Sequence, residues 1–194
     1  MKLRGLYAIT PEAPDVLEKA QQAMEGGIAL LQYRRKRRDV HEAREVVALA
    51  RRYAVPVIIN DDFELALEVD AAGAHLGRDD GDLGVARARL AGKILGTSCY
   101  NDAALARKAV NLGVDYVAFG SVFASATKPE AVRAPLALFS KEALAVPLCA
   151  IGGITLENAP QLIAAGASLL AVISDLFDAP DIAGRAAQYR KLFP

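Results

Sequence analysis

The stretch Leu30-Leu31-Gln32-Tyr33-Arg34-Arg35-Lys36 predicts a buried β-strand with a strongly cationic C-terminal end. Alternate side chains of a strand share a face, so Gln32, Arg34 and Lys36 are expected to point one way and the residues between them the other. The planar fork of an arginine and the compact charge of a lysine suit a phosphate or diphosphate. Because two more arginines continue the run, a solvated charge cluster is the simple alternative.

Short apolar runs rich in Val, Ile and Leu recur on both sides of this stretch, and Ala-rich amphipathic segments separate them. Continuous apolar strands of this kind are typical of a parallel sheet covered on both faces. The expected strands are 6–10, 30–36, 57–60, 74–77, 94–99, 116–122, 148–151 and 170–174. Clear helical patterns cover 16–25, 41–53, 102–112 and 158–165.

Eight such units predict an α/β fold, a single-domain (β/α)8 TIM barrel over residues 1–194, because right-handed crossovers between parallel strands can close a ring of that number. A doubly wound open sheet is the alternative. Each unit has about 24 of the 194 residues, so the barrel must be compact with short connections. No linker or second domain interrupts the pattern.

The composition restricts the possible functions. The 23 basic and 23 acidic residues cancel, so no global field attracts nucleic acid or an anionic membrane. No apolar run reaches the roughly 18 residues that a membrane span needs. Cys99 and Cys149 lie in apolar runs without metal or redox spacing, and we expect core thiols. We therefore expect a soluble, cytoplasmic protein with small-molecule partners, and the sequence leaves a homo-oligomer open.

In a TIM barrel the functional groups lie at the C-terminal ends of the strands and in the loops that follow. Asp61 and Asp80 follow neighbouring strands close to the cationic stretch. Carboxylate oxygens combined with substrate phosphate oxygens suit Mg²⁺, so these two aspartates predict a magnesium-diphosphate site. The alternative is helix capping, which is the better interpretation for Asp62 and a candidate one for Asp79.

A second anion site is predicted after the last three strands. The hydroxyls of Ser125 and Thr127 precede Lys128, although Ser and Thr alone are common in loops. Gly152-Gly153 lets backbone amides approach an anion, and Ser174 after the last strand adds a hydroxyl. The loops after strands seven and eight frequently bind phosphate in such barrels, which strengthens the prediction.

The remaining candidates have simpler interpretations. His75 and Tyr7 sit at strand positions and are expected to be packed core residues, and His41 is expected on the surface. No Ser/His/Asp set, nucleophilic cysteine or zinc spacing is present, so covalent catalysis has no support.

These residues together make the sequence resemble the thiamine-phosphate synthase family. Short matching pieces follow one another through nearly the whole chain: GLYAIT (5–10), QYRRK (32–36), IIND (58–61), HLG (75–77), GTSC (96–99), DYVAFG (115–120), TK (127–128), AIGGI (150–154) and VIS (172–174). The family joins 4-amino-2-methyl-5-hydroxymethylpyrimidine diphosphate to a thiazole phosphate, which gives thiamine phosphate and diphosphate. The resemblance implies the same transferase activity and a Mg²⁺ cofactor.

The resemblance also implies roles for individual residues. The pyrimidine diphosphate would be held by Gln32, Arg34, Lys36, Asn60, Ser98 and Lys128, of which Arg34, Lys36, Ser98 and Lys128 would be catalytic. Magnesium would be bound by Asp61 and Asp80. The thiazole phosphate would meet Ser125, Thr127, Gly153, Ile173 and Ser174. The family often has threonine at the position of Ser125, and the neighbouring Ala124 and Ala126 are smaller than expected, so the conformation of this loop stays open.

The implied mechanism is dissociative, with cations stabilising the departing diphosphate and the thiazole nitrogen capturing a pyrimidine-stabilised cation. Two alternatives remain. An isomerase paralogue with the same barrel often has a histidine where this chain has Ser121. A non-catalytic phosphate or RNA binder would use residues 34–38, but base-stacking aromatics are missing apart from Tyr33, and the net charge is zero. The sequence leaves open whether the thiazole is carboxylated.

Overall fold

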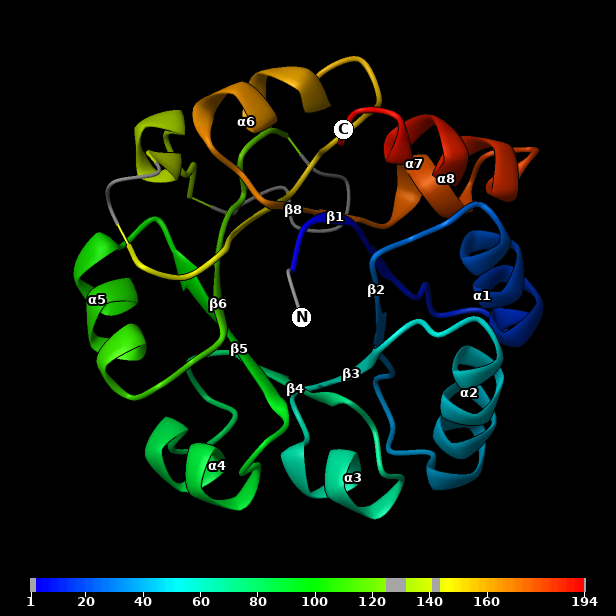
Figure 1. The fold of residues 1–194 in the computed structure, drawn as a ribbon, viewed down its shortest axis with the longest axis horizontal. Helices are drawn as coiled ribbons and strands as arrows, with labels where there is room; N and C mark the ends of the chain where they lie inside the picture. The colour runs from blue at the N-terminus through cyan, green and yellow to red at the C-terminus, as the bar shows by residue number, and fades with distance from the viewer. Residues whose placement is uncertain (1–2, 125–131, 141–143, 194) are drawn as a thin grey trace.

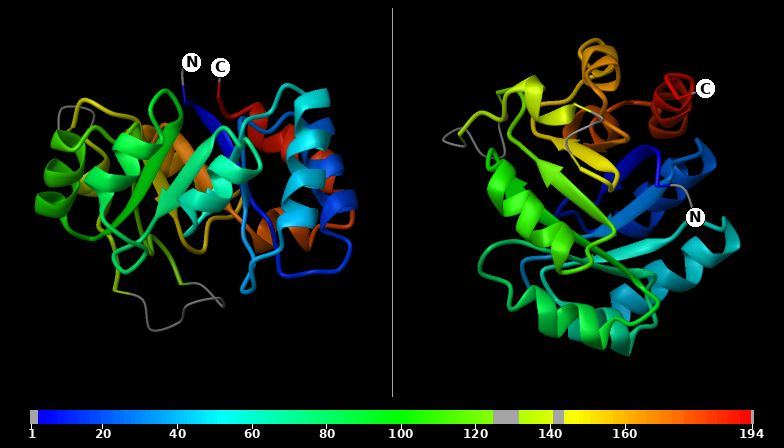
Figure 2. Two further views of the ribbon diagram at one scale, coloured as in Figure 1. Left: turned by 90° about the horizontal axis from the view of Figure 1, so that it is seen from below. Right: turned by 60° about the vertical axis from the view of Figure 1, so that its left-hand side comes forward.

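The computed structural model describes residues 3–124, 132–140 and 144–193. Eight parallel strands close into a barrel in chain order, with β1 paired to both β2 and β8. Helices surround this ring on the outside (Figure 1), and the two further views show the strands crossing the middle of the molecule between them (Figure 2). The expected (β/α)8 barrel is confirmed, and the doubly wound open sheet is excluded.

The strands are short and mostly buried. They are β1 (Gly5–Ile9), β2 (Leu30–Tyr33), β3 (Val57–Asn60), β4 (Gly73–Leu76), β5 (Ile94–Tyr100), β6 (Tyr116–Phe119), β7 (Leu148–Ile151) and β8 (Leu169–Val172). The helices are α1 (Val16–Glu25), α2 (Val40–Arg52), α3 (Phe63–Glu68), α4 (Leu83–Arg89), α5 (Ala103–Asn111), α6 (Ala159–Ala165), α7 (Ser174–Phe177) and α8 (Ile182–Arg190), with the 3₁₀ helix η1 (Leu136–Phe139). Within the described residues, none of these helices has the length and apolar character that a bilayer crossing requires.

Five expected strands were too long at their C-terminal ends, two of them (6–10 and 74–77) by a single residue and three by more. β2 ends at Tyr33, because the next amide, that of Arg34, donates to the Thr10 hydroxyl (2.9 Å). β6 ends at Phe119, and the chain then runs across β7, where the Val122 amide donates to the Ile151 carbonyl (3.0 Å). β8 ends at Val172, because Ser174 already begins α7. The cationic residues therefore lie in the loop after β2 and do not continue the strand.

The apolar core has two layers. The outer layer lies between strands and helices and includes Leu31, Ile59 and Cys99, and the inner layer inside the ring includes Ile58 and Cys149. Fully burying one such aliphatic side chain contributes about 1.5–3 kcal/mol. Both cysteines are buried free thiols, and burial raises the pKa of Cys99 to about 12. The expectation of core thiols is confirmed.

Aspartate side chains cap most of the helices. Asp62 accepts a hydrogen bond from the Leu65 amide (2.7 Å) at the start of α3, so its predicted capping role is confirmed. The corresponding prediction for Asp79 was wrong. The helix α4 begins only at Leu83, and its cap is Asp82, which accepts from the Val85 amide (2.9 Å). Each such cap is worth about 1 kcal/mol.

Candidate active site

The ends of β2 to β5 bring most of the predicted pyrimidine and metal residues to one sector of the barrel mouth. These strands are neighbours in the ring, so residues at their C-terminal ends lie side by side (Figure 1). The sector contains Gln32 at the end of β2, Arg34 and Lys36 in the next loop, Asn60 at the end of β3 followed by Asp61, Asp80 in the loop after β4, and Ser98 near the end of β5.

Hydrogen bonds fix the backbone of the cationic loop, while the side chains of Arg34 and Lys36 stay available to a ligand. The Thr10 hydroxyl accepts a hydrogen bond from the Arg34 amide (2.9 Å), and the Lys36 amide donates to the Glu12 carboxylate (3.2 Å). Within the described residues, no side-chain hydrogen bond or ion pair holds either Arg34 or Lys36. The pKa of Asp61 is raised by its surroundings, and the Arg34 charge offsets part of that rise, so this guanidinium lies near the Asp61 carboxyl group. Such cations suit an anionic ligand.

Arg35 points to the other face, as the alternation predicts, and holds two loops together. Its guanidinium pairs with the Glu42 carboxylate on α2 (Nε to Oε1, 2.6 Å) and donates to the carbonyls of Pro11 (2.6 Å) and Ala13 (2.8 Å) after β1. Tyr33 donates to the same carboxylate (2.7 Å). The hydrogen bond from Arg35 holds the pKa of Glu42 below its usual value. We call the Arg35–Glu42 pair with its two carbonyl contacts the Arg35 clamp.

Asp61 and Asp80 form a close pair of carboxyl groups. Asp61 has a left-handed backbone (φ 63°), and its amide donates to the His75 carbonyl (2.8 Å). Asp80 accepts from the Gly77 amide (2.7 Å). The residue Asp61 is exposed overall, but partial withdrawal of its carboxyl group from water, together with the hydrogen bond and charge of Asp80, raises its pKa to about 6.

This carboxylate pair fits a divalent cation, because a positive ion would relieve the repulsion between the two carboxylates. Among the described residues, no group of three or more His, Cys, Asp or Glu side chains could hold a metal. Two carboxylates alone leave most positions of an octahedral ion to water and to a ligand, which is the usual arrangement for Mg²⁺ with phosphates.

The inside of the barrel below this sector contains a continuous hydrogen-bonded chain. Gln32 Nε2 donates to the Tyr7 hydroxyl (2.7 Å), which contacts the Tyr116 hydroxyl (2.8 Å). Tyr116 contacts His75 Nδ1 (2.9 Å), and His75 Nε2 contacts the Ser98 hydroxyl (2.9 Å). We call these five residues the barrel relay. Burial lowers the pKa of His75 to about 4, so the ring is neutral at physiological pH.

The sequence predicted that His75 and Tyr7 are buried, which is confirmed, but missed the barrel relay. One signal was available. Gly96 interrupts an apolar strand, and it pairs directly with Tyr116 in the β5–β6 register. A Cβ atom at Gly96 would overlap the Tyr116 ring, so this glycine makes room for the aromatic side chain that crosses the barrel. A glycine inside a strand commonly marks such a close approach.

The second predicted anion site is only partly described. Ser125, Thr127 and Lys128 lie outside the described residues. Gly152 and Gly153 follow β7 with left-handed backbones (φ 105° and 61°). A side chain at Gly152 would overlap Ser121, and one at Gly153 would overlap the Ala124 backbone, so the loops after β6 and β7 pack tightly.

The neighbouring elements complete the described part of this site. Asn158 donates from Nδ2 to the Gly153 carbonyl (2.9 Å), which fixes the glycine loop from the start of α6. Ile173 and Ser174 follow β8 at the adjacent position in the ring, and Ser174 is exposed. Gly153, Ile173 and Ser174 are thus brought to one side of the mouth, as predicted. The Ser121 hydroxyl is already used within its own loop, because it donates a hydrogen bond to the Phe123 carbonyl (2.6 Å).

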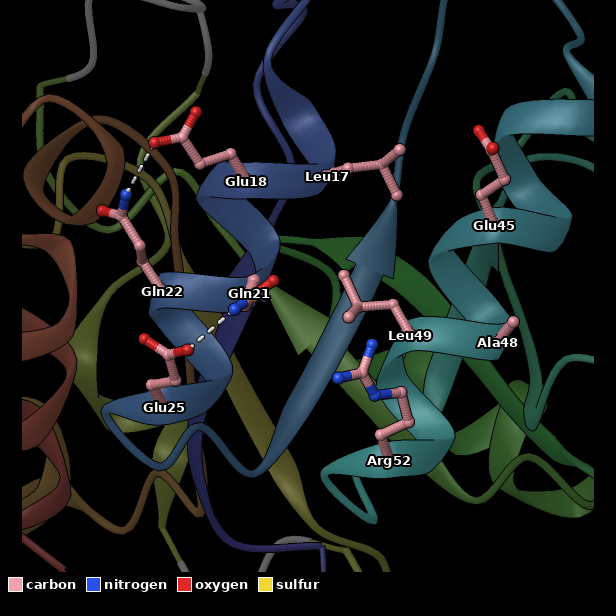
Figure 3. Close-up of a pocket in the computed structure, with 9 residues that line it drawn as sticks. All are labelled: Leu17, Glu18, Gln21, Gln22, Glu25, Glu45, Ala48, Leu49 and Arg52. Carbon is pink, nitrogen blue, oxygen red and sulfur yellow. Dashed lines mark hydrogen bonds between the residues drawn. The ribbon is translucent and has the colours of Figure 1, made fainter.

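A separate groove lies on the outer surface between α1 and α2 (Figure 3). Its volume is about 770 Å³, and it is lined by Leu17 and Leu49 with several polar side chains around them. The figure shows two hydrogen bonds within α1, from Gln21 to Glu25 and from Gln22 to Glu18. None of the predicted site residues that the structure describes lines this groove, so it is distinct from the mouth of the barrel.

Comparison with known proteins connects this geometry to a family. Residues 6–176 match the family described as thiamine monophosphate synthase. The chain belongs to this family. It is 58% identical to a thiamine-phosphate synthase of Aromatoleum aromaticum, with 99% of this chain and 97% of the relative covered. A thiamine-phosphate synthase of Methylobacillus flagellatus is 50% identical, with 98% and 96% covered.

A solved structure of the same family has the same fold. The thiamine phosphate pyrophosphorylase of Pyrococcus furiosus superposes with a TM-score of 0.89 at 32% identity, and the match covers 98% of this chain and 96% of that one. The resemblance stated from the sequence is confirmed, and the chain is a transferase enzyme of thiamine biosynthesis. The cytoplasmic location and the homo-oligomer stay predictions.

Proposed function

We propose that the enzyme condenses 4-amino-2-methyl-5-hydroxymethylpyrimidine diphosphate with 4-methyl-5-(2-phosphooxyethyl)thiazole, or its carboxylated form, to give thiamine phosphate and diphosphate. The observation that carries the proposal is the position of the Asp61–Asp80 pair beside Arg34 at the barrel mouth. Carboxylates for a cation and cations for an anion occur there together, as a metal-bound diphosphate requires. Family membership supports the same reaction.

In this proposal Gln32, Asn60 and Ser98 bind the pyrimidine diphosphate together with Arg34, Lys36 and Lys128, and Asp61 and Asp80 hold Mg²⁺. The thiazole phosphate is bound by Ser125, Thr127, Gly153, Ile173 and Ser174. The left-handed glycines and the adjacent start of α7 support that half, because backbone amides free of side chains can approach a phosphate.

The chemistry follows from electrostatics and positioning. Arg34, Lys36 and Lys128 stabilise negative charge as it develops on the departing diphosphate. Magnesium, when bound, would supply further positive charge at the same oxygens. The aminopyrimidine delocalises the cation that remains, and the thiazole nitrogen, held close by its phosphate, captures it. No protein nucleophile takes part.

An isomerase that moves a proton on the thiazole is the nearest alternative. That reaction needs a general acid or base within reach of the ring. At the position where such paralogues often have histidine, this chain has Ser121, whose hydroxyl is used by the Phe123 carbonyl. The residue therefore offers no base, and the synthase reaction is favoured.

The decisive experiment follows thiamine phosphate, by the fluorescence of its oxidised form, together with diphosphate release. Purified enzyme is incubated with the pyrimidine diphosphate and with either form of the thiazole phosphate, and each component and Mg²⁺ are omitted in turn. Product is expected only in the complete mixture, and the two thiazoles rank the substrate preference. Absence of product despite tight binding of the thiazole phosphate would contradict the proposal in favour of the isomerase or a binding role.

A further inference from the structure

The barrel relay joins two residues that the proposed function assigns to the pyrimidine, and this inference rests on that function. Gln32 begins the relay on β2 and Ser98 ends it on β5, at the two ends of the sector that β2 to β5 form. Between them, Tyr7, Tyr116 and His75 are 1%, 0% and 7% exposed. Water is therefore excluded as a substitute partner, and each interior group must be satisfied by its neighbours in the relay.

The direction of one bond determines the direction of all the others. The Tyr7 oxygen accepts from the Gln32 amide nitrogen, so the Tyr7 hydrogen is left for Tyr116. Tyr116 accepts that bond, and its own hydrogen then goes to His75 Nδ1. A neutral imidazole that accepts at Nδ1 carries its hydrogen on Nε2, and this hydrogen is donated to the Ser98 oxygen. Each hydroxyl has one hydrogen, so the relay is polarised as a unit.

We propose that the barrel relay presets the hydrogen-bonding pattern offered to the aminopyrimidine: the Gln32 carbonyl oxygen as acceptor and the Ser98 hydroxyl hydrogen as donor. When each relay residue donates to the next one from Gln32 to Ser98, neither of these two atoms takes part in a hydrogen bond of the relay. An aminopyrimidine carries an exocyclic amino donor and ring-nitrogen acceptors, which complement this pair. Tyr7, Tyr116 and His75 are positioning residues that act through the two ends.

Only one other arrangement satisfies the same contacts. With the Gln32 amide rotated, Tyr7 would donate to its oxygen, every later bond would reverse, and Ser98 would give its hydrogen to His75. The Nδ1–H tautomer of His75 would then replace the Nε2–H tautomer. The tautomer of a buried ring thus reports the orientation of an amide at the far end of the relay.

The test is ¹⁵N NMR of the enzyme labelled in histidine, without any substrate, at pH 7.5. The chain has two histidines, and His41 is assigned by the variant His41→Gln. The Nε2–H tautomer of His75 is the expected result. An Nδ1–H tautomer would overturn the proposal. The measurement does not depend on turnover, so a failed synthase assay and a failed relay are distinguishable.

A variant at the far end tests whether polarity is transmitted. Gln32→Glu places an acceptor-only carboxylate against Tyr7, so His75 is expected to switch to the Nδ1–H tautomer. An unchanged tautomer would contradict transmission. If this variant does not fold, Tyr7→Phe serves instead: it disconnects Tyr116 from Gln32, and a mixture of both tautomers is expected. A single Nε2–H tautomer in Tyr7→Phe would show that Gln32 does not set the polarity.

Steady-state kinetics tests whether the barrel relay affects binding of the pyrimidine diphosphate. Tyr116→Phe is expected to raise KM for the pyrimidine diphosphate about tenfold, the usual effect of one lost buried hydrogen bond, and to leave KM for the thiazole phosphate unchanged. Tyr53→Phe is the matched control, since its hydroxyl contacts Glu25 on the outer surface (3.1 Å). An equal rise in both KM values, or no rise in either, would contradict a positioning role specific to the pyrimidine.

Discussion

Asp61 combines several unfavourable features at one position. Its backbone is left-handed, its carboxyl group lies against that of Asp80, and its pKa is raised to about 6. Asparagine tolerates left-handed backbone well and carries no charge. The residue is therefore expected to lower the stability of the metal-free protein in exchange for cation binding, a trade that is common at functional sites.

Asp61→Asn is predicted to raise the melting temperature of the metal-free enzyme at pH 8 by about 2–4 °C, which corresponds to about 1 kcal/mol for a chain of this size. The same variant should lose the additional stabilisation that Mg²⁺ with diphosphate gives the wild type. Thermal unfolding with and without these ligands measures both effects. Asp62→Asn, which keeps a capping side chain, is the control and should respond to the ligands like wild type. A lower melting temperature with an intact magnesium response would exclude Asp61 as a ligand.

Lys36→Ala is predicted to lower kcat by about a hundredfold or more, because it removes one preorganised charge from the developing diphosphate. Steady-state kinetics with saturating substrates measures the change. Arg37→Ala is the matched control one residue further along the same exposed run, and it should keep kcat within about twofold of wild type. Equal losses in both variants would indicate a general charge effect instead of a specific contact.

Single residues were predictable from sequence where their partners are local. The cap Asp62 follows from its place directly before a helical pattern, whereas Asp79 failed because the chain inserts a turn before α4 and Asp82 takes the capping position. The contacts of His75 could not be read in this way. They join it to residues 23 and 41 positions away, and only the closed ring brings these together.

Among the secondary-structure elements, the Arg35 clamp joins α2 to the loops after β1 and β2. The folded state lowers the pKa of Glu42 below the ordinary 4.5, mainly through its hydrogen bond with Arg35. As the pH falls, Glu42 is therefore protonated at a higher pH in the unfolded chain than in the folded protein. The stabilisation from this pair is complete above pH 4.5 and is lost as the pH falls through the folded-state pKa.

Glu42→Gln is predicted to destabilise the enzyme by about 1–3 kcal/mol at pH 7, because the charged hydrogen bonds become weaker. The difference from wild type should shrink below pH 4.5, when the wild-type carboxylate is protonated as well. Urea unfolding at a series of pH values gives both numbers. Glu45→Gln, an exposed position on the same helix, should show no such pH-dependent difference. A difference that stays constant down to pH 3 would contradict the ionic origin of the clamp.

Gly96→Ala is predicted to displace the Tyr116 ring from the middle of the barrel and to cost about 1–3 kcal/mol, the usual range for overpacking a core. The pyrimidine diphosphate should bind more weakly, since the barrel relay is interrupted. Denaturant unfolding and substrate titration measure the two effects. Gly84→Ala in α4 is the control and should change stability by less than about 1 kcal/mol, because alanine favours a helix while its Cβ would lie 3.1 Å from the Asp82 carboxylate that caps this helix. A stable Gly96→Ala enzyme with normal binding would show that Tyr116 has room to move.

Strand and helix types were predictable, but several strand ends were not. The expected α1 residues match those observed, because its amphipathic pattern is complete. Arg34 and Lys36 were wrongly placed within β2, since an alternating pattern continues past the last ladder hydrogen bond. The strand ends where Thr10 of another loop takes the next amide, and that contact joins residues 24 positions apart.

For the molecule as a whole, the number of strand-helix units predicted a closed ring, and the pairing of Tyr7 with Ala171 completes it. What the sequence could not supply is the inner layer, where side chains from distant strands meet. The alternation of strand residues indicates which side chains point inward. It does not indicate which of them touch, because that depends on the stagger of all eight strands.

The two cysteines offer a test of whether this ring opens as one unit. Cys99 lies in the outer layer and Cys149 inside the barrel. We predict that thiol labelling under native conditions modifies both at rates within about threefold of each other, because each must wait for global unfolding. The variants Cys99→Ser and Cys149→Ser leave one thiol each and separate the rates. A much faster reaction at either thiol would reveal a local opening of the ring.

The pairing of β1 with β8 also has a consequence during synthesis. The ribosome releases β1 first and β8 near the end, so the first strand waits for almost the whole chain before its second neighbour exists. Until then, the nascent barrel presents two unpaired sheet edges with apolar faces, which other chains can join. Ring closure is therefore a late, long-range event, and in the interval before it the two open edges can pair with other chains.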